Sequence, residues 1–193
     1  MLQRKTALTI LIGSIIPVFA ACGGRLYNVA PLPASAPPEI SMGKSGGMDI
    51  GAVALNGEQS YERFEANLPL AGVIAVDVRM INKSESTIMT NSLKFELRNA
   101  NGAALKQIAP KKALGVVMKY YGDRFYTKIA YRRTLEDYES VSFRQGASIE
   151  PEGEIRGIVF FQTKRETKSV DGLILSVAGL TTPVSVQLRT AHN

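Results

Sequence analysis

Tryptophan is absent from this chain of 193 residues, and cysteine and histidine occur once each. The cysteine is Cys22, near the N-terminus, and the histidine is His192, next to the last residue. With one cysteine the chain forms no internal disulfide, and zinc sites built from cysteine and histidine are excluded by number. A serine–histidine–aspartate triad needs a firmly held base, which a terminal histidine does not provide. These shortages remove the most familiar catalytic centres.

The signature loops of nucleotide-binding and metalloprotease sites are missing as well. The chain contains no GxGxxG, no Walker loop and no HExxH. Its formal charge is +6, which falls to +4 if Arg4 and Lys5 are lost with a leader segment. This mild basicity suits contact with an anionic surface but is weak for a nucleic-acid-binding protein. We therefore expect no cofactor, no metal and no nucleic-acid partner.

The N-terminus has the pattern of an export signal. Arg4 and Lys5 precede an apolar run of 16 residues, 6–21. This run is shorter than the roughly 20 residues that a membrane-spanning helix needs. A basic start, an apolar core and small residues before a cleavage point are typical of a secretory signal peptide.

The end of this run, Ala20-Ala21-Cys22, resembles the lipobox of bacterial lipoproteins, although Phe19 stands where an aliphatic residue is usual. The resemblance implies that residues 1–21 are a cleaved signal peptide and that Cys22 is acylated. A single acyl chain binds a membrane only marginally, whereas two or more chains hold a protein there stably. An uncleaved anchor and an ordinary signal cut elsewhere are the alternatives.

The lipoprotein resemblance also implies a location and a division of the chain. Gly23 follows the cysteine, where lipoproteins kept in the inner membrane of diderm bacteria usually carry aspartate, so the outer membrane is implied for a diderm host. Residues 22–47 are rich in proline, glycine and serine, a composition typical of a tether. One domain is expected over residues 48–193.

Alternating apolar and polar residues predict that this domain is mainly β. The clearest strand covers 73–81, where every second residue from Ile74 to Met80 is apolar while Asp77 and Arg79 fall on the other face. Strand patterns cover 48–55, 60–68 (a strand or an irregular edge), 73–81, 92–99, 103–108, 155–163, 173–177 and 184–188. Seven or eight short strands favour an antiparallel β-sandwich.

The strand and turn pattern resembles immunoglobulin-type (telokin-like) domains of exported bacterial lipoproteins over roughly residues 70–190. The features that carry this resemblance are the strand 74–81 before Asn82-Lys83-Ser84, the strand 93–97 before Asn101-Gly102, and Pro151-Glu152-Gly153 before the strand with Phe160-Phe161. The resemblance implies an immunoglobulin-like β-sandwich and brings no catalytic residue with it.

Residues 109–141 interrupt the strands with helical spacing. Four apolar or aromatic positions follow i, i+3, i+4 and i+7, namely Leu114, Val117, Met118 and Tyr121. Pro110 suits a first helical position and Gly122 suits a C-terminal cap. A second helix is expected to begin at Thr134. The sequence therefore predicts a short helical insert in the β domain.

This insert concentrates cationic and tyrosine side chains. Arginine and tyrosine are enriched at binding hot spots, and cations in the first turn of a helix conflict with the helix dipole unless an anion binds there. The candidate anion or partner surface consists of Lys111, Lys112, Lys119, Tyr120, Tyr121, Arg124, Tyr126, Arg132 and Arg133. The alternative is a structural cap whose tyrosines pack on the sheet while its lysines face water.

Carboxylates offer the remaining route to catalysis. Glu150, Glu152 and Glu154 alternate around a proline and a glycine. They could cluster for acid–base chemistry, or they could form a solvated turn before a strand. An enzyme needs two of them to converge in a cleft with shifted pKa values, whereas a binding module needs none.

Two functional hypotheses follow. The first is a lipid-anchored cell-envelope protein that acts as a non-catalytic binding or structural module, with anionic lipid, wall polymer or another envelope protein as its partner. The second is a carboxylate-based hydrolase or carbohydrate-active enzyme of the envelope.

Overall fold

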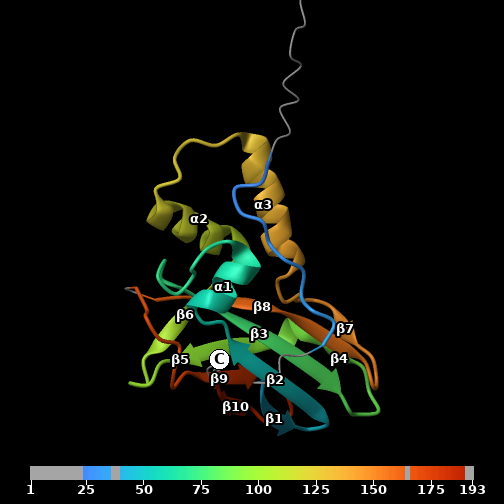
Figure 1. The fold of residues 1–193 in the computed structure, drawn as a ribbon. Helices are drawn as coiled ribbons and strands as arrows, with labels where there is room; N and C mark the ends of the chain where they lie inside the picture. The colour runs from blue at the N-terminus through green and yellow to red at the C-terminus, as the bar shows by residue number, and fades with distance from the viewer. Residues whose placement is uncertain (1–23, 36–39, 164–165, 190–193) are drawn as a thin grey trace, which may run out of the picture.

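A computed structural model describes residues 24–35, 40–163 and 166–189 and shows a curled antiparallel sheet with helices packed on its outer side (Figure 1). The predicted signal peptide (1–21), Cys22 and His192 lie outside the described residues. Among the helices that the structure describes, none has the length and apolarity needed to cross a membrane.

One sheet holds eight strands, and each strand pairs with its neighbours in antiparallel fashion. Their spatial order is β1 (Ser41–Ser45), β2 (Met48–Ala54), β3 (Val73–Asn82), β8 (Glu154–Gln162), β6 (Ala104–Ile108), β5 (Lys94–Arg98), β9 (Ile174–Ala178) and β10 (Val184–Gln187). A separate two-stranded pair consists of β4 (Ile88–Met89) and β7 (Ser148–Ile149).

The two edge strands of this sheet, β1 and β10, come close together, so the sheet is nearly closed. The hydroxyl of Ser41 in β1 accepts a hydrogen bond from the backbone N–H of Arg189, just past β10, at 3.2 Å. Gly43 allows the approach, because a Cβ atom at this position would lie 2.6 Å from Cγ1 of Val184. Contact between the edges protects strands that would otherwise be open to pairing with other chains.

The prediction of a mainly β, antiparallel domain is confirmed, but an immunoglobulin-like sandwich is not. Strand β6 joins the two halves of the sheet: Leu105 pairs with Leu97 of β5, while Gln107 pairs with Phe161 of β8. The strands therefore form one continuous, curled sheet. Strand patterns in the sequence do not say whether a short strand pairs with one neighbour or with two.

Two hydrophobic cores lie on opposite faces of the sheet. The inner core fills the curled sheet and contains Ile74, Val76, Val78 and Met80 of β3, as the alternation predicted. The outer core lies between the sheet and the helices and includes Val73 and Ala75 of β3. Both faces of this strand are therefore buried, so its polar positions are not simply solvent-facing.

In the part of the chain that the structure describes, three α-helices cover the outer face of the sheet. Figure 1 shows where they lie relative to the strands. They are α1 (Gly57–Phe64), α2 (Pro110–Tyr121) and α3 (Lys128–Ser140), and a short 3-10 turn, η1, spans Thr90–Ser92. Helices α2 and α3 form the insert predicted over 109–141. The caps predicted for its first helix are confirmed, because Pro110 begins α2 and Gly122 closes it with φ of 74°.

The predicted start of the second insert helix at Thr134 is wrong. Helix α3 begins at Lys128, and the hydroxyl of Thr127 caps it by accepting a hydrogen bond from the N–H of Ala130 at 3.0 Å. Thr134 is buried within the helix, and its hydroxyl accepts a hydrogen bond from the N–H of Leu26 at 2.8 Å. Three of the residues in 128–133 are cationic, so the apolar residues of the first turns of α3 did not stand out as a helical pattern.

The strand or edge expected over 60–68 is replaced in part by helix α1. Asn56 caps this helix: its side-chain oxygen accepts from the N–H of Gln59 at 2.9 Å, and the Gln59 side chain accepts from the N–H of Asn56 at 3.1 Å. This reciprocal pair is a capping box, which the spacing of Asn56 and Gln59 could have revealed.

Asn56→Ala is expected to lower the free energy of unfolding by about 1 kcal/mol, because the first turn of α1 loses its side-chain acceptor. Chemical denaturation followed by circular dichroism measures this change. Glu62→Ala, at an exposed position of the same helix, is the matched control and should change stability by less than about 0.5 kcal/mol. Equal effects of the two substitutions would show that the capping box does not stabilise α1.

The tether predicted over 22–47 needs correction for its described residues. Strand β1 belongs to the sheet, and Tyr27 is buried in the outer core. Residues 24–35, which we name the N-terminal strap, run along the helices (Figure 1). Proline-rich composition favours an extended backbone, but it does not say whether an extended backbone packs against the rest of the chain.

Polar contacts fix the strap along its length. The N–H of Ala30 donates to the carbonyl of Arg63 at 2.7 Å, and the Arg63 guanidinium donates to the carbonyl of Pro31 at 2.8 Å. Farther on, the guanidinium of Arg156 in β8 donates to the carbonyl of Pro33 at 2.5 Å. The domain thus includes residues that precede the predicted boundary at 48.

Candidate functional site

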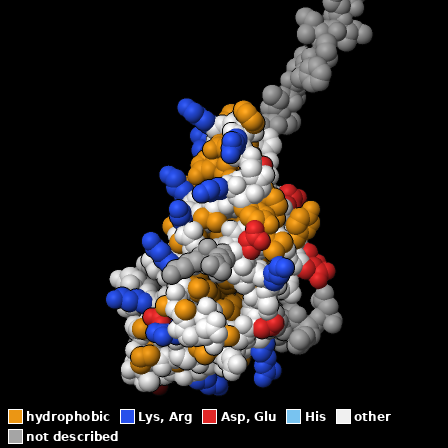
Figure 2. Space-filling view, turned by 90° about the vertical axis from the view of Figure 1, so that its left-hand side faces the viewer, with side chains coloured by type: hydrophobic (Ala, Val, Ile, Leu, Met, Phe, Trp, Pro, Cys, Tyr) orange, Lys and Arg blue, Asp and Glu red, His pale blue; other side chains and the backbone are white. Residues whose placement is uncertain are grey.

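A groove lined by lysines runs beside helix α2. Its volume is about 540 Å³, and α2 contributes the side chains of Lys111, Lys112 and Lys119 together with Tyr120. The opposite wall comes from residues 70–72, at the turn before β3, and from the end of β8 and the residues that follow it. Figure 2 shows lysine and arginine side chains along one edge of the helical half of the molecule.

The amphipathic pattern of α2 explains why these lysines share one face. Leu114, Val117 and Met118 are buried in the outer core and fix the orientation of the helix. Lys112 and Lys119 are seven residues apart, so they lie on the same side of the helix, away from this core. Lys111, Lys112 and Lys119 are all exposed and line the same groove.

The N-terminus of α2 adds positive potential to this groove. Ala109 is the N-cap residue and supplies no side-chain acceptor, and no acidic residue lies in the first turn. The positive end of the helix dipole is therefore not compensated by the helix itself. Glu166 also lines the groove, so the site combines three cations with one carboxylate.

The loop between α2 and α3, together with the first two residues of α3, forms a second exposed surface. We name residues 123–129 the insert tip. Phe125 is fully exposed there, and Arg124, Tyr126 and Ile129 are exposed around it. Tyr126 stacks on Tyr131 of α3, with ring centroids 5.7 Å apart. The tip thus presents apolar and cationic groups side by side.

The nine predicted site residues do not form one patch. Lys111, Lys112, Lys119 and Tyr120 line the groove, and Arg124 and Tyr126 lie at the tip. Arg132 is exposed on α3 and forms an ion pair with Glu136 at 3.7 Å, and Arg133 is exposed on the same helix.

Tyr121 has a structural role in addition to its exposure. Its hydroxyl accepts a hydrogen bond from the N–H of Asn67 at 2.9 Å, and its ring lies 6.3 Å from that of Tyr27. Phe125 and Ile129 were not among the predicted site residues. The signal in the sequence was the position of Phe125. It follows the C-terminal cap Gly122 and precedes the next helix, so it lies in a loop, where no amphipathic helix buries it.

The three glutamates considered for catalysis bind different partners. Glu154 accepts two hydrogen bonds from Arg79, both of 2.6 Å, and this guanidinium lowers the pKa of Glu154. Glu152 pairs with Lys83, and Glu150 accepts from the hydroxyl of Thr87 at 2.6 Å. The three are exposed and do not converge. Among the described residues, no group of three or more His, Cys, Asp or Glu side chains could hold a metal ion.

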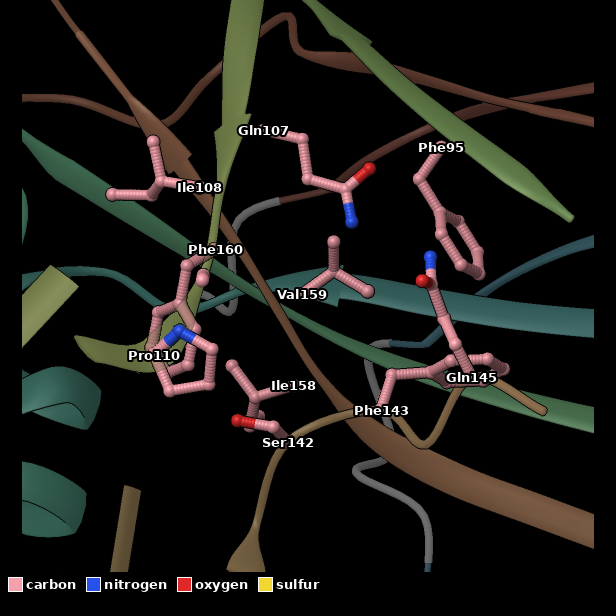
Figure 3. Close-up of a pocket in the computed structure, with 11 residues that line it drawn as sticks. Phe95, Gln107, Ile108, Pro110, Ser142, Phe143, Gln145, Ile158, Val159 and Phe160 are labelled. Carbon is pink, nitrogen blue, oxygen red and sulfur yellow. The ribbon is translucent and has the colours of Figure 1, made fainter. Parts of the chain in front are cut away.

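A second hollow lies under the start of α2 and is mainly apolar. It has a volume of about 450 Å³ and lies between β6, β8 and the segment after α3. Figure 3 shows Phe95 and Gln145 on one side of it and Ile108, Pro110 and Phe160 on the other. Its polar side chains are Gln107, Ser142 and Gln145, so the residues that line it include no acid or base for proton transfer.

No protein-family model matches this chain, and no curated protein matches it in sequence. Two solved structures show a distant likeness. The yjhA protein from Bacillus subtilis is 12% identical, covers 77% of this chain and 96% of its own, and gives a TM-score of 0.43. A conserved hypothetical protein from Bacillus anthracis is 13% identical, covers 76% of this chain and 92% of its own, and gives a TM-score of 0.34. At these TM-scores neither likeness carries an argument about fold or function.

Proposed function

We propose that this protein is an exported lipoprotein, anchored to a bacterial membrane through Cys22, whose domain is a non-catalytic binding module of the cell envelope. The small residues before Cys22 support the anchoring. The lysine groove supports the binding, and its ligand is a phosphate-bearing group of the envelope, from a wall polymer or from an anionic lipid headgroup.

The carrying observation is that Lys111, Lys112 and Lys119 line the same wall of one hollow, next to an uncompensated helix N-terminus. Charge-assisted hydrogen bonds from ammonium groups are stronger than neutral ones, and lysine binds phosphate as a point charge. The apolar residues at 70–71 and Tyr120 form part of the wall, so the groove also contacts the uncharged part of a ligand. Glu166 disfavours ligands that place negative charge at its end of the groove.

The alternative, a carboxylate-based hydrolase, is supported less well. Catalysis by two carboxylates requires a pair that flanks the substrate, with one pKa raised so that the group stays protonated. Glu150, Glu152 and Glu154 bind separate partners, and the pKa of Glu154 is shifted in the opposite direction. Two surface ion pairs, of Glu152 and Glu154, and one hydrogen bond, to Glu150, explain these side chains.

Replacing the three groove lysines, Lys111→Glu, Lys112→Glu and Lys119→Glu, is expected to weaken ligand binding by at least about tenfold, which corresponds to about 1.4 kcal/mol. The measurement is co-sedimentation of the lipid-free mature chain (Cys22→Ser) with two ligands. One is purified phosphate-bearing wall polymer, and the other is vesicles that contain anionic phospholipid. Binding should also weaken with salt, because exposed charges are screened within about 10 Å at 0.1 M.

The matched control is a variant with the same change in net charge at exposed lysines outside the groove, with Lys94, Lys106 and Lys168 changed to Glu. It should keep most of the binding, because it leaves the groove intact. A loss confined to the polymer identifies wall polymer as the source of the phosphate, and a loss confined to vesicles identifies lipid headgroups. Equal losses in the two variants would contradict a specific groove.

A further inference from the structure

The insert tip exposes apolar side chains that folding does not use. Phe125 is 100% exposed, and Ile129, the second residue of α3, is 48% exposed. A phenylalanine that contacts nothing in its own chain loses the hydrophobic free energy that burial would give it. Exposed apolar residues that lie together mark interaction sites more often than isolated ones do.

The surroundings of Phe125 are cationic. Arg124 precedes it, and Lys128 begins α3 three residues later. The acid of the tip, Asp123, accepts a hydrogen bond from the hydroxyl of Tyr27 in the strap, so its charge is partly compensated. In Figure 2 the upper end of the molecule shows hydrophobic and basic side chains together, while acidic side chains lie lower.

The strap brings the start of the described chain to this same end of the molecule. Arg25 forms an ion pair with Asp137 of α3, and the N–H of Leu26 donates to the hydroxyl of Thr134. The hydroxyl of Tyr27 donates to Asp123, the first residue of the tip. Figure 1 shows the blue N-terminal strap beside α3, and the α2–α3 loop lies at the same helical end of the molecule. Consecutive Cα atoms are about 3.8 Å apart, so two peptide units place Cys22 within about 8 Å of Gly24.

We propose that the insert tip is the membrane-contact surface of the domain. Phe125 and Ile129 enter the interface of the membrane that holds the acyl chains of Cys22, and Arg124 and Lys128 contact its anionic headgroups. The proposal rests on the lipid anchor of the proposed function. It adds an orientation: the helices face the membrane, and the edge strands β1 and β10 face away from it.

The position of the anchor favours a membrane as the occupant of this surface. A lipid attached within about 8 Å of Gly24 leaves the helical end of the domain little freedom to move away from the bilayer. A surface held there meets headgroups at high effective concentration. An apolar tip with basic flanks is the composition of interfacial segments, which bury apolar side chains about 5–10 Å into the headgroup region. Tyr126 suits the same zone, because tyrosine places its ring in the apolar layer and its hydroxyl in water.

A tryptophan at the tip tests this proposal cleanly, because the natural chain contains none. The lipid-bearing full-length mature protein with Phe125→Trp is placed in vesicles of phosphatidylethanolamine and phosphatidylglycerol. We expect its emission to shift to shorter wavelength and to be quenched by lipids brominated on their acyl chains. The matched control is Met42→Trp, at an exposed position of β1 at the opposite end of the fold, which should show neither effect.

Each other outcome identifies a different error. If mass spectrometry of the natural protein finds no acyl chain on Cys22, the lipid anchor of the proposed function is wrong. If the protein is anchored but the indole of the Phe125→Trp variant stays unquenched, the anchor stands and the membrane-contact surface is overturned. A shift that depends on protein concentration in detergent, without vesicles, would assign the tip to a second copy of the chain and would also overturn the proposal.

Discussion

Asp77→Asn is expected to lower the free energy of unfolding by about 3–5 kcal/mol, because it leaves the guanidinium of Arg156 as a buried charge without its counterion. The side chains of Asp77 and Arg156 are 1% and 9% exposed. They lie on neighbouring strands, β3 and β8, and form two hydrogen bonds of 2.9 and 2.6 Å. Two parallel hydrogen bonds to one carboxylate match the planar guanidinium. A neutral amide at position 77 offers only one acceptor oxygen and no negative charge.

Glu96→Gln is the matched control for this prediction, because it makes the same change from acid to amide in an exposed pair with Arg98. Exposed pairs contribute roughly 0–1 kcal/mol, so this variant should remain close to the natural protein. Equilibrium denaturation in urea gives both values. If the two substitutions cost the same, the buried pair is not a determinant of stability.

A second variant separates the charge from the packing. Asp77→Leu combined with Arg156→Met removes both charges, and it should recover much of the lost stability, because apolar side chains of similar size replace a buried ion pair at little cost. The double variant still loses the bonds from Arg156 to the carbonyls of Pro33 and Ser35. Hydrogen exchange at the strap should therefore rise even where global stability returns.

This pair also shows what the strand pattern could and could not predict. Alternation along β3 correctly separated Asp77 from Val76 and Val78. The pattern did not reveal that the other face is covered by the strap and the helices, since these segments come from distant parts of the chain. The alternation of residues along a strand shows on which face each side chain lies. It does not show whether another part of the chain covers that face.

The same distinction runs through the rest of the fold and the site. Helix α2 was predictable because Pro110 and Gly122 act through local backbone geometry. The concentration of lysines in the insert predicted a cationic surface. The opposite wall of the groove comes from residues 70–72 and from the end of β8, which only the tertiary fold brings near. The burial of Tyr27 in the strap was likewise not predictable. The proline-, glycine- and serine-rich composition indicates how an isolated segment behaves, and it does not indicate what the segment packs against.

Phe64→Ala is expected to destabilise the protein by about 3–5 kcal/mol, the usual cost of deleting a buried phenylalanine. Phe64 is fully buried at the end of α1, and its ring lies 5.0 Å from that of Tyr138 and 5.8 Å from that of Phe160. These three rings join α1, α3 and β8 in the outer core. Tyr61→Ala, at an exposed position of α1, should change stability by less than about 0.5 kcal/mol.

Tyr138 supplies the companion experiment, because its ring and its hydroxyl should act in opposite directions. Burial raises the pKa of this hydroxyl, which stays neutral, and it has no hydrogen-bond partner among the described residues. Tyr138→Phe keeps the ring contacts and removes the unpaired group, so stability should stay unchanged or rise by up to about 1 kcal/mol. A loss near that of Phe64→Ala would mean that the hydroxyl is bonded in solution. If the expected pattern holds, ring packing joins the helical insert, and with it the groove and the tip, to the sheet.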